Sequence, residues 1–241
     1  MGNDANRAEL LSQPAHDPRT GLAQRRHEGG THEGGRRSGA TGGELMRLFV
    51  AIAPPPAVLD ELDARVDPLR ARQEDLRWTN REAWHVTLAF LGQVDEPTAA
   101  RLMPRLERAA RRYRNIRLAF SGAGAFPAPD RANVLWSGLS GDCVALARLA
   151  ESVAAGATRA GSPPPGKTRR FQPHMTLARC RMPADVTGLV AALAGYQGQP
   201  WTADRVHLVR SRLGGTEQPR YSSLASWPLY ALDRDTADPA S

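Results

Sequence analysis

The amino-acid sequence predicts an α+β fold with two pseudo-symmetric lobes, in which mainly antiparallel strands carry helices on the outside. Two observations predict this fold class. From Met46 onward, segments with the period of a strand alternate with segments with the period of a helix, and the second half repeats the order of the first. The chain also holds 41% apolar residues, enough for a core of its own. No linker separates the halves, so we expect one compact bilobal unit.

Both ends of the chain depart from this pattern. Residues 1–45 are dominated by Gly, Arg, His, Glu and Ser and show no apolar periodicity, which is typical of a disordered tail. Residues 233–241 are expected to form a disordered C-terminus as well. The folded domain should therefore cover residues 46–232.

The first half alternates strands and helices. Alternation over MRLFVAI predicts a half-buried strand at 46–52 that prolines end. Val58, Leu62 and Val66 have the spacing of one helix face. The other elements predicted in this half are a strand at 85–92 closed by Gly92, a helix at 96–113 with Pro104 inside it, and strands at 116–127 and 133–139.

The second half repeats this order. Each lobe then consists of strands linked by crossover helices, the arrangement expected of an α+β fold with mainly antiparallel pairing. The elements predicted here are a helix at 143–161, a Pro-rich basic loop at 162–170, a strand at 174–180, a helix at 184–196, and closing strands at 205–214 and 220–230.

The formal net charge of +7 comes almost wholly from arginine, because Lys167 is the only lysine. Two explanations are open at this point. A GC-rich genome can encode Arg in place of Lys, or the protein can have a polyanionic partner whose phosphate oxygens Arg binds bidentately. In residues 1–44 six Arg balance six Asp and Glu, so the positive excess belongs to the folded part.

The sequence gives no sign of a membrane or secretory location. No apolar run reaches the roughly 18 residues of a membrane span, and the N-terminus lacks the apolar stretch of a secretory signal. Cys143 and Cys180 are far apart and match neither a disulfide framework nor a zinc spacing. We therefore expect a cytoplasmic protein.

The most informative feature is a four-residue pattern that occurs twice, as HVTL at 85–88 and HMTL at 174–177. Because strand side chains alternate between faces, each His and its Thr should lie side by side on one face of the sheet. The apolar residues of both segments, with Phe90, should point the opposite way into a core. A random chain of this composition would contain roughly 0.03 such segments. Two of them in strands, one per lobe, favour a functional pair over two ordinary structural histidines.

A pair of imidazoles suits the in-line displacement of a phosphodiester. A base must take a proton from the attacking oxygen, and an acid must protonate the leaving oxygen; imidazole fits both roles because its ordinary pKa lies near neutrality. If the lobes hold His85 and His174 on opposite sides of one phosphate, Thr87 and Thr176 can hydrogen-bond its non-bridging oxygens. No HxD or HExxH spacing accompanies these histidines, so we expect no metal and no cofactor.

A longer series of motifs accompanies the two histidines, in the order MRLFVAI, RW, HVTLAFLG, GAFP, VLW, RRFQPHMTLAR, VRSRLGG and then Tyr221. The series runs from residue 46 to about residue 229. It resembles the two-histidine phosphoesterase family, and within it the RNA 2′,3′-cyclic phosphodiesterases once called 2′–5′ RNA ligases. The order of the motifs makes this resemblance specific, whereas HxT alone would not.

The resemblance implies a bilobal enzyme that hydrolyses a terminal 2′,3′-cyclic phosphate to a 2′-phosphomonoester in the cleft between its lobes. It implies that His85 is the proton donor and His174 the proton acceptor. Thr87 and Thr176 correspond to the hydroxyls of the family motif, and they are expected to bind the substrate. The partner implied is RNA with 2′,3′-cyclic phosphate ends, and we expect the enzyme to be a monomer.

Two further positions are carried over from the family. Arg179 corresponds to a basic residue that assists the phosphate, although strict alternation aims it away from the histidine face, so a bulge or the end of the strand must redirect it. Phe171 corresponds to a base-stacking position and is equally consistent with a core phenylalanine. The sequence departs from the family at Asn133, which stands before VLW where relatives often have Arg; Arg131, assigned to the same strand face, is a candidate replacement.

Alternatives to this function are open at the level of sequence. The same pair could act on another cyclic phosphate or carry out 2′–5′ ligation. A protein of a different class, a binding module, could hold nucleotides or RNA ends without turnover. The presence of a second histidine argues against the binding module, because a binder has no need of both.

Overall fold

The computed structural model describes residues 44–230, apart from residue 74 and segments 166–170 and 213–219. The predicted tails at 1–45 and 233–241 fall almost wholly outside the described residues, and so does the basic end of the predicted loop at 162–170. The described elements, in order, are β1 (Met46–Ile52), α1 (Pro56–Arg70), β2 (Arg77–Trp78), the 3-10 helix η3 (Arg81–Ala83), β3 (Val86–Val94), α2 (Glu96–Ala110), β4 (Ile116–Phe126), the 3-10 helix η4 (Pro129–Arg131), β5 (Ala132–Gly141), α3 (Cys143–Ala160), β6 (His174–Ala184), α4 (Thr187–Leu193), β7 (Trp201–Ala203), β8 (Arg205–Arg212) and β9 (Arg220–Pro228).

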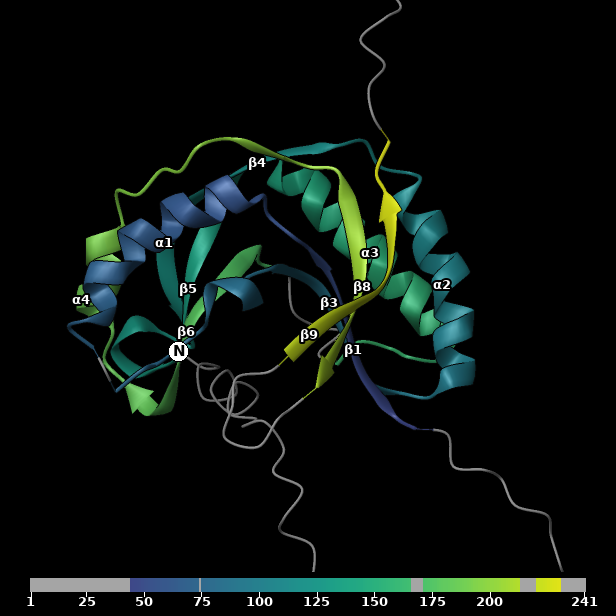
Figure 1. The fold of residues 1–241 in the computed structure, drawn as a ribbon, viewed down its shortest axis with the longest axis horizontal. Helices are drawn as coiled ribbons and strands as arrows, with labels where there is room; N and C mark the ends of the chain where they lie inside the picture. The colour runs from purple at the N-terminus through teal and green to yellow at the C-terminus, as the bar shows by residue number, and fades with distance from the viewer. Residues whose placement is uncertain (1–43, 74, 166–170, 213–219, 231–241) are drawn as a thin grey trace, which may run out of the picture. The chain divides into compact units, whose positions relative to one another are not determined.

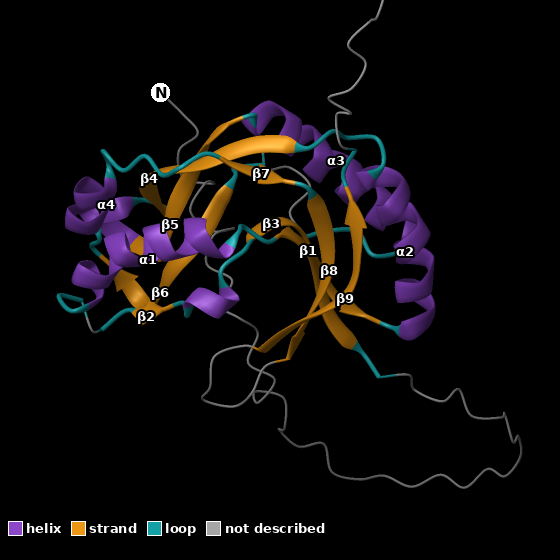
Figure 2. Ribbon diagram, turned by 45° about the horizontal axis from the view of Figure 1, so that its top comes forward, coloured by secondary structure: helices purple, strands orange, loops and turns teal. Residues whose placement is uncertain are grey.

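The strands form one nine-stranded sheet with antiparallel pairings and the order β7-β4-β5-β6-β3-β1-β8-β9, while β2 pairs with β6. The sheet curls, with α1 and α4 over the half that contains β4, β5 and β6, and α2 and α3 over the half that contains β1, β3, β8 and β9 (Figures 1 and 2). The predicted α+β class and its two lobes are confirmed. No described helix is long and apolar enough to cross a membrane.

Local sequence signals account for the helix ends. The Asp95 carboxylate caps α2 by accepting a hydrogen bond of 2.8 Å from the Thr98 amide. Helix α3 ends at Gly161, which has a φ of +93°. A residue with a side chain would be strained in this left-handed conformation. Leu102 and Leu106 of α2 are fully buried, and so are Leu146 and Leu149 of α3, so each helix packs one apolar face onto the sheet.

Strand β1 is buried on both faces, which corrects the half-buried strand predicted from its alternation. Leu48 to Ile52 are all less than 5% exposed. One face of the strand packs in the core. The other face is covered by side-chain rings, because Phe49 stacks on His85 and makes an edge contact with Tyr221. The alternating pattern therefore predicted the position of the strand correctly, but it did not predict that both faces are buried.

Both HxTL segments contain a β-bulge at the same place. In β3 the partners of Val50 and Ala51 are Ala89 and Thr87, so Leu88 is an extra residue; in β6 Leu177 is extra in the same way. Each bulge buries two successive residues and returns the next one to the histidine face. Phe90 is therefore 51% exposed rather than in the core, which corrects the prediction made for it. The bulge in β6 returns Arg179 to the histidine face, the change of direction that the resemblance called for.

Candidate active site

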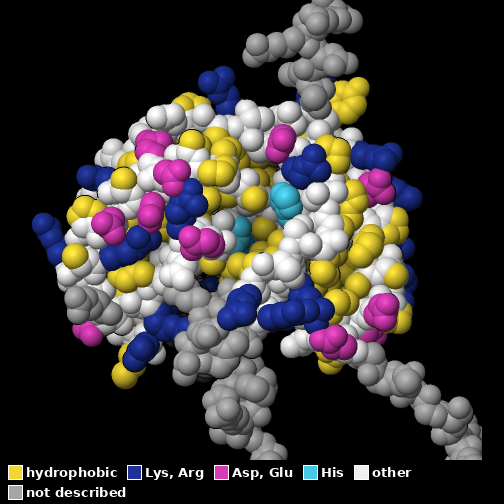
Figure 3. Space-filling view, viewed as in Figure 1, with side chains coloured by type: hydrophobic (Ala, Val, Ile, Leu, Met, Phe, Trp, Pro, Cys, Tyr) yellow, Lys and Arg dark blue, Asp and Glu magenta, His cyan; other side chains and the backbone are white. Residues whose placement is uncertain are grey.

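The two lobes meet where the two HxT segments meet. Strands β3 and β6 are joined through the register pair Val86 and Met175, both fully buried. These are the residues that follow His85 and His174, so the two imidazoles lie on either side of the junction. Figure 3 shows histidine side chains at a central hollow, with Lys and Arg side chains gathered at one edge of it.

The two imidazoles are held by the same contact. Nδ1 of His85 lies 2.7 Å from the carbonyl oxygen of Ala83, and Nδ1 of His174 lies 2.8 Å from that of Gln172. A carbonyl oxygen only accepts, so Nδ1 carries the proton in both rings. Each Nε2 is thereby left as the atom that accepts a proton in the neutral ring and donates one in the imidazolium. In both lobes the histidine is thus oriented by the backbone carbonyl two residues before it.

Aromatic rings surround each histidine. The His85 ring stacks on Phe49 at 4.6 Å between centroids and meets Tyr221 edge-on at 5.2 Å. On the other lobe His174 meets Phe126 edge-on at 5.0 Å, with Trp136 at 6.1 Å. Both imidazoles are therefore fixed in orientation by packing on the ring and by hydrogen bonding at Nδ1.

Burial dominates the electrostatics of both histidines. It lowers the pKa of His85 from its ordinary 6.5 to about 4, against the Ala83 carbonyl, which raises it; the charges of Arg179 and His174 lower it further. Burial also lowers the pKa of His174. The hydrogen bond to the Gln172 carbonyl opposes this shift, and the charge of Arg179 adds to it. Both shifts favour the neutral imidazole in the free enzyme. A bound phosphodiester anion would raise both pKa values, because it favours the imidazolium.

A stability prediction follows from the lowered pKa of His85. The unfolded chain protonates this side chain near pH 6.5, whereas the folded chain resists protonation down to about pH 4. The folded state should therefore lose stability as pH falls through that window, by at most about 3 kcal/mol because the side chain is only half-buried. We expect His85→Gln to make the free energy of unfolding fall less steeply between pH 6.5 and 4, as measured by urea titration. Equal slopes in both proteins would contradict the assignment.

The charge of Arg179 lowers the pKa of both histidines. Its strand position pairs with Arg77 of β2. Arg179 is exposed at the edge of the site, yet the protein atoms around its guanidinium lower its pKa by desolvation; Tyr221 opposes this shift, and Arg47 and Arg77 add to it. Three arginines thus contribute positive potential around the histidine pair, which suits an anionic ligand.

Of the other predicted site residues, the two threonines lie on the histidine face, Phe171 packs against the core, and Arg131 does not lie on the strand face expected for it. Thr87 and Thr176 are half-buried on the histidine face, and the β3–β6 register sets each threonine level with the histidine of the other strand. Phe171 is half-buried and packs against the core; the described ring contacts of His174 come from other aromatic residues. Arg131 ends η4 rather than lying in β5, so the strand face assumed for it beside Asn133 does not apply.

Sequence reasoning missed the aromatic rings around the histidines. Phe126 and Trp136 lie in the GAFP and VLW motifs, but nothing in one strand tells which ring it will meet on the next. Trp136 pairs with Gly124 of β4 and with Thr176 of β6. A Cβ on Gly124 would lie 2.3 Å from the indole, so this glycine makes room for the ring. In the described residues no group of three or more His, Cys, Asp or Glu side chains could hold a metal ion.

A curled antiparallel sheet that presents one HxT histidine from each lobe at their junction defines the class of the two-histidine phosphoesterases. The comparisons with known proteins agree. A family profile described as the 2′-5′ RNA ligase superfamily matches residues 58–215. The chain belongs to this superfamily.

Curated relatives and solved structures support the family. A protein of Aeropyrum pernix named RNA 2′,3′-cyclic phosphodiesterase is 39% identical over 46% of this chain, and the match spans 61% of that protein. A protein of the same name from Thermus thermophilus is 30% identical over 76% of this chain and 90% of its own length. Crystal structures of E. coli LigT complexed with 3′-AMP and of a Thermus thermophilus protein superpose with TM-scores of 0.61 and 0.60. Their sequences are 25% and 29% identical, and each match covers 77% of this chain and 99% of the other.

Proposed function

We propose that this protein hydrolyses RNA 2′,3′-cyclic phosphodiester ends to 2′-phosphomonoesters by general acid–base catalysis with His85 and His174, without a metal ion. The observation that carries the proposal is the pair of imidazoles at the lobe junction, each with Nδ1 fixed on a carbonyl and Nε2 left for proton transfer. Relatives at modest identity bear the name of this activity. The domain responsible is residues 46–232, and a monomer suffices because one chain supplies every proposed site residue.

In the reaction, Nε2 of His174 takes a proton from water as the water oxygen bonds to phosphorus. The bond from phosphorus to the 3′ oxygen breaks, and Nε2 of the His85 imidazolium gives its proton to that oxygen. The 2′ oxygen keeps the phosphate, so the product is a 2′-phosphomonoester with a free 3′ hydroxyl. The net proton count is unchanged, and the two histidines exchange protonation states.

The remaining residues act on the phosphate and the base. Thr87 and Thr176 donate hydrogen bonds to the non-bridging oxygens, where charge concentrates in the transition state. Arg179 adds a charged donor on the same face. Phe171 offers a ring to the terminal base, a role that its half-buried position leaves room for.

The pH dependence of catalysis should differ between the free and the occupied enzyme. Because burial lowers the pKa of both histidines, the bell-shaped profile of kcat/KM should have its optimum below pH 6.5. The bound phosphate raises both pKa values, so the optimum of kcat should lie at higher pH. Initial rates across about pH 4 to 9 at low and at saturating substrate give the two profiles. Coincident optima would mean that substrate charge does not reach the histidines.

The proposed function is tested by incubating the purified protein and EDTA with an oligonucleotide that ends in a 2′,3′-cyclic phosphate, followed by ³¹P NMR of the products. We expect a 2′-phosphomonoester. Binding without turnover would support the binding module, and a 2′–5′ linkage formed with a second oligonucleotide would support ligation. Activity lost in EDTA and restored by a divalent ion would contradict the metal-free mechanism.

A further inference from the structure

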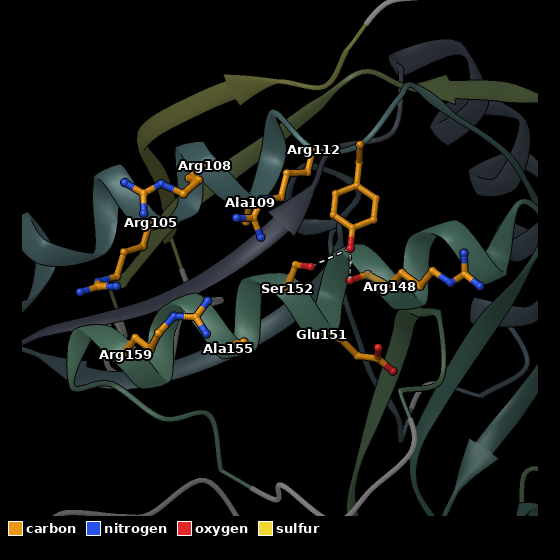
Figure 4. Close-up of a pocket in the computed structure, with 10 residues that line it drawn as sticks. Arg105, Arg108, Ala109, Arg112, Arg148, Glu151, Ser152, Ala155 and Arg159 are labelled. Carbon is orange, nitrogen blue, oxygen red and sulfur yellow. Dashed lines mark hydrogen bonds between the residues drawn. The ribbon is translucent and has the colours of Figure 1, made fainter.

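A groove lined by arginines lies between α2 and α3, outside the two-histidine site (Figure 4). It encloses about 580 Å³, and ten residues line it. One of the ten is acidic, Glu151, and five are arginines: Arg105, Arg108, Arg112, Arg148 and Arg159. The groove is therefore strongly positive.

The arginines form two facing rows. Arg105 and Arg108 lie on one face of α2, and Arg112 follows in the turn just after the helix end. Arg148 and Arg159 lie eleven residues apart along α3. The helices run antiparallel, because the Tyr113 hydroxyl after the end of α2 donates to the Arg148 carbonyl near the start of α3, at 2.8 Å. At about 1.5 Å per residue the rows extend about 10 and 16 Å, longer than a single phosphate needs.

These cations lack partners within the described part of the chain. The described ion pairs involve other arginines, and the pair nearest the groove joins Arg111, just after α2, to Glu107 of α2. Arg108, Arg112, Arg148 and Arg159 are exposed. Repulsion among unpaired guanidinium groups along one groove is relieved most directly by an anion placed between them.

The groove lies on the opposite side of the sheet from the histidines. The buried faces of α2 and α3 pack on the sheet half that contains β3, and Val86 and Leu88 of β3 are buried in that core. Thr87 alternates with them and points to the other face. A ligand in the groove therefore does not touch the reacting phosphate, and a substrate confined to one nucleotide cannot fill both places.

We propose that this groove binds the phosphodiester backbone of RNA, at a place separate from the end that reacts. The inference rests on the proposed function in taking RNA as the ligand. Two facing rows of arginines along an elongated groove fit a chain of phosphates, because each guanidinium group can bind a phosphate bidentately. Tyr113 adds a half-buried ring at one end of the groove, and hydrogen bonds of its hydroxyl with the Arg148 carbonyl and the Ser152 hydroxyl fix that ring in place. The exposed part of the ring could stack on a base. The groove would thus favour RNA over an isolated cyclic nucleotide.

The test compares two triple variants of equal charge. The groove variant replaces Arg108, Arg112 and Arg148 with Gln, and the control replaces the exposed Arg72, Arg111 and Arg117, which do not line the groove. The ligand is a labelled single-stranded RNA with a 3′ hydroxyl, which cannot be hydrolysed, and binding is measured by fluorescence anisotropy over a salt series. Turnover of a nucleoside 2′,3′-cyclic phosphate is measured in parallel.

We expect the groove variant alone to bind this RNA at least about tenfold more weakly. Its slope of log K against log salt should be shallower by about 2, because each phosphate that the groove no longer neutralises reduces the slope by about 0.7. Turnover of the nucleoside substrate should equal that of the wild type, which also shows that the fold is intact. Equal binding losses in both variants, or none in either, would overturn the groove proposal. Absence of turnover in the wild type would instead overturn the proposed function. The anisotropy measurements would still show whether the groove binds RNA.

Discussion

Replacing His174 with Ala is expected to lower kcat for cyclic-phosphate RNA by about 10²–10⁴. The reason is that the attacking water would lose the Nε2 that takes its proton. His85→Ala should cause a loss of the same order by removing the donor to the leaving 3′ oxygen. The dissociation constant of a 2′-phosphorylated product should change little, because Arg179 and both motif threonines remain.

The matched control is His207→Ala. This third described histidine lies in β8, half-buried, with Nδ1 3.4 Å from the Ser223 hydroxyl and no HxT threonine beside it. We expect kcat within a few-fold of the wild type. Equal losses at His207 and His174 would mean that histidine replacement damages this sheet generally, and circular dichroism with thermal melts would show it.

The second large effect is expected at Arg179. Under the proposed function, Arg179→Gln would remove a charge-assisted hydrogen bond to the phosphate, worth roughly 1.5–3 kcal/mol, so kcat/KM should fall about 10- to 150-fold. The same change should also move the pH profile. Because the charge of Arg179 lowers the pKa of His85 and of His174, its removal should raise both and shift the kcat/KM optimum to higher pH.

Two further variants separate charge from geometry at this position. Arg179→Lys keeps the cation but loses the planar fork, so kcat/KM should fall while the pH optimum stays near that of the wild type. Arg181→Gln removes an exposed arginine from the same strand and should leave both unchanged. A normal pH optimum in Arg179→Gln would contradict electrostatic coupling between Arg179 and the histidines.

Much of the fold was predictable because strand and helix periods are local properties of the sequence. The two HxTL segments identified the strands and faces that carry the histidines, and the ordered motifs identified the family. The bulge near Arg179 was also predictable, because a residue of the wrong parity had to reach the histidine face. Phe90 follows the equivalent bulge in the other lobe, where no residue of known role revealed the change of face, and its predicted burial was wrong.

What the sequence could not supply depends on pairing between distant strands. Phe49 and Tyr221 close over His85 because β1 lies beside β3 and β9 follows β8, an order that no single segment encodes. Burial in this enclosure lowers the pKa of His85 to about 4, a shift that the ordinary pKa of imidazole does not anticipate. The arginine groove likewise exists only because α2 and α3 pack side by side.

The most direct test of the central claim is a double-mutant cycle on kcat with the wild type, His85→Ala, His174→Ala and the double variant, all assayed in EDTA on cyclic-phosphate RNA. If both imidazoles act in one transition state, the double variant should be only slightly slower than the slower single variant, far from the product of the two losses. Losses that multiply, or near-normal turnover by a folded His174→Ala variant, would contradict the two-histidine mechanism.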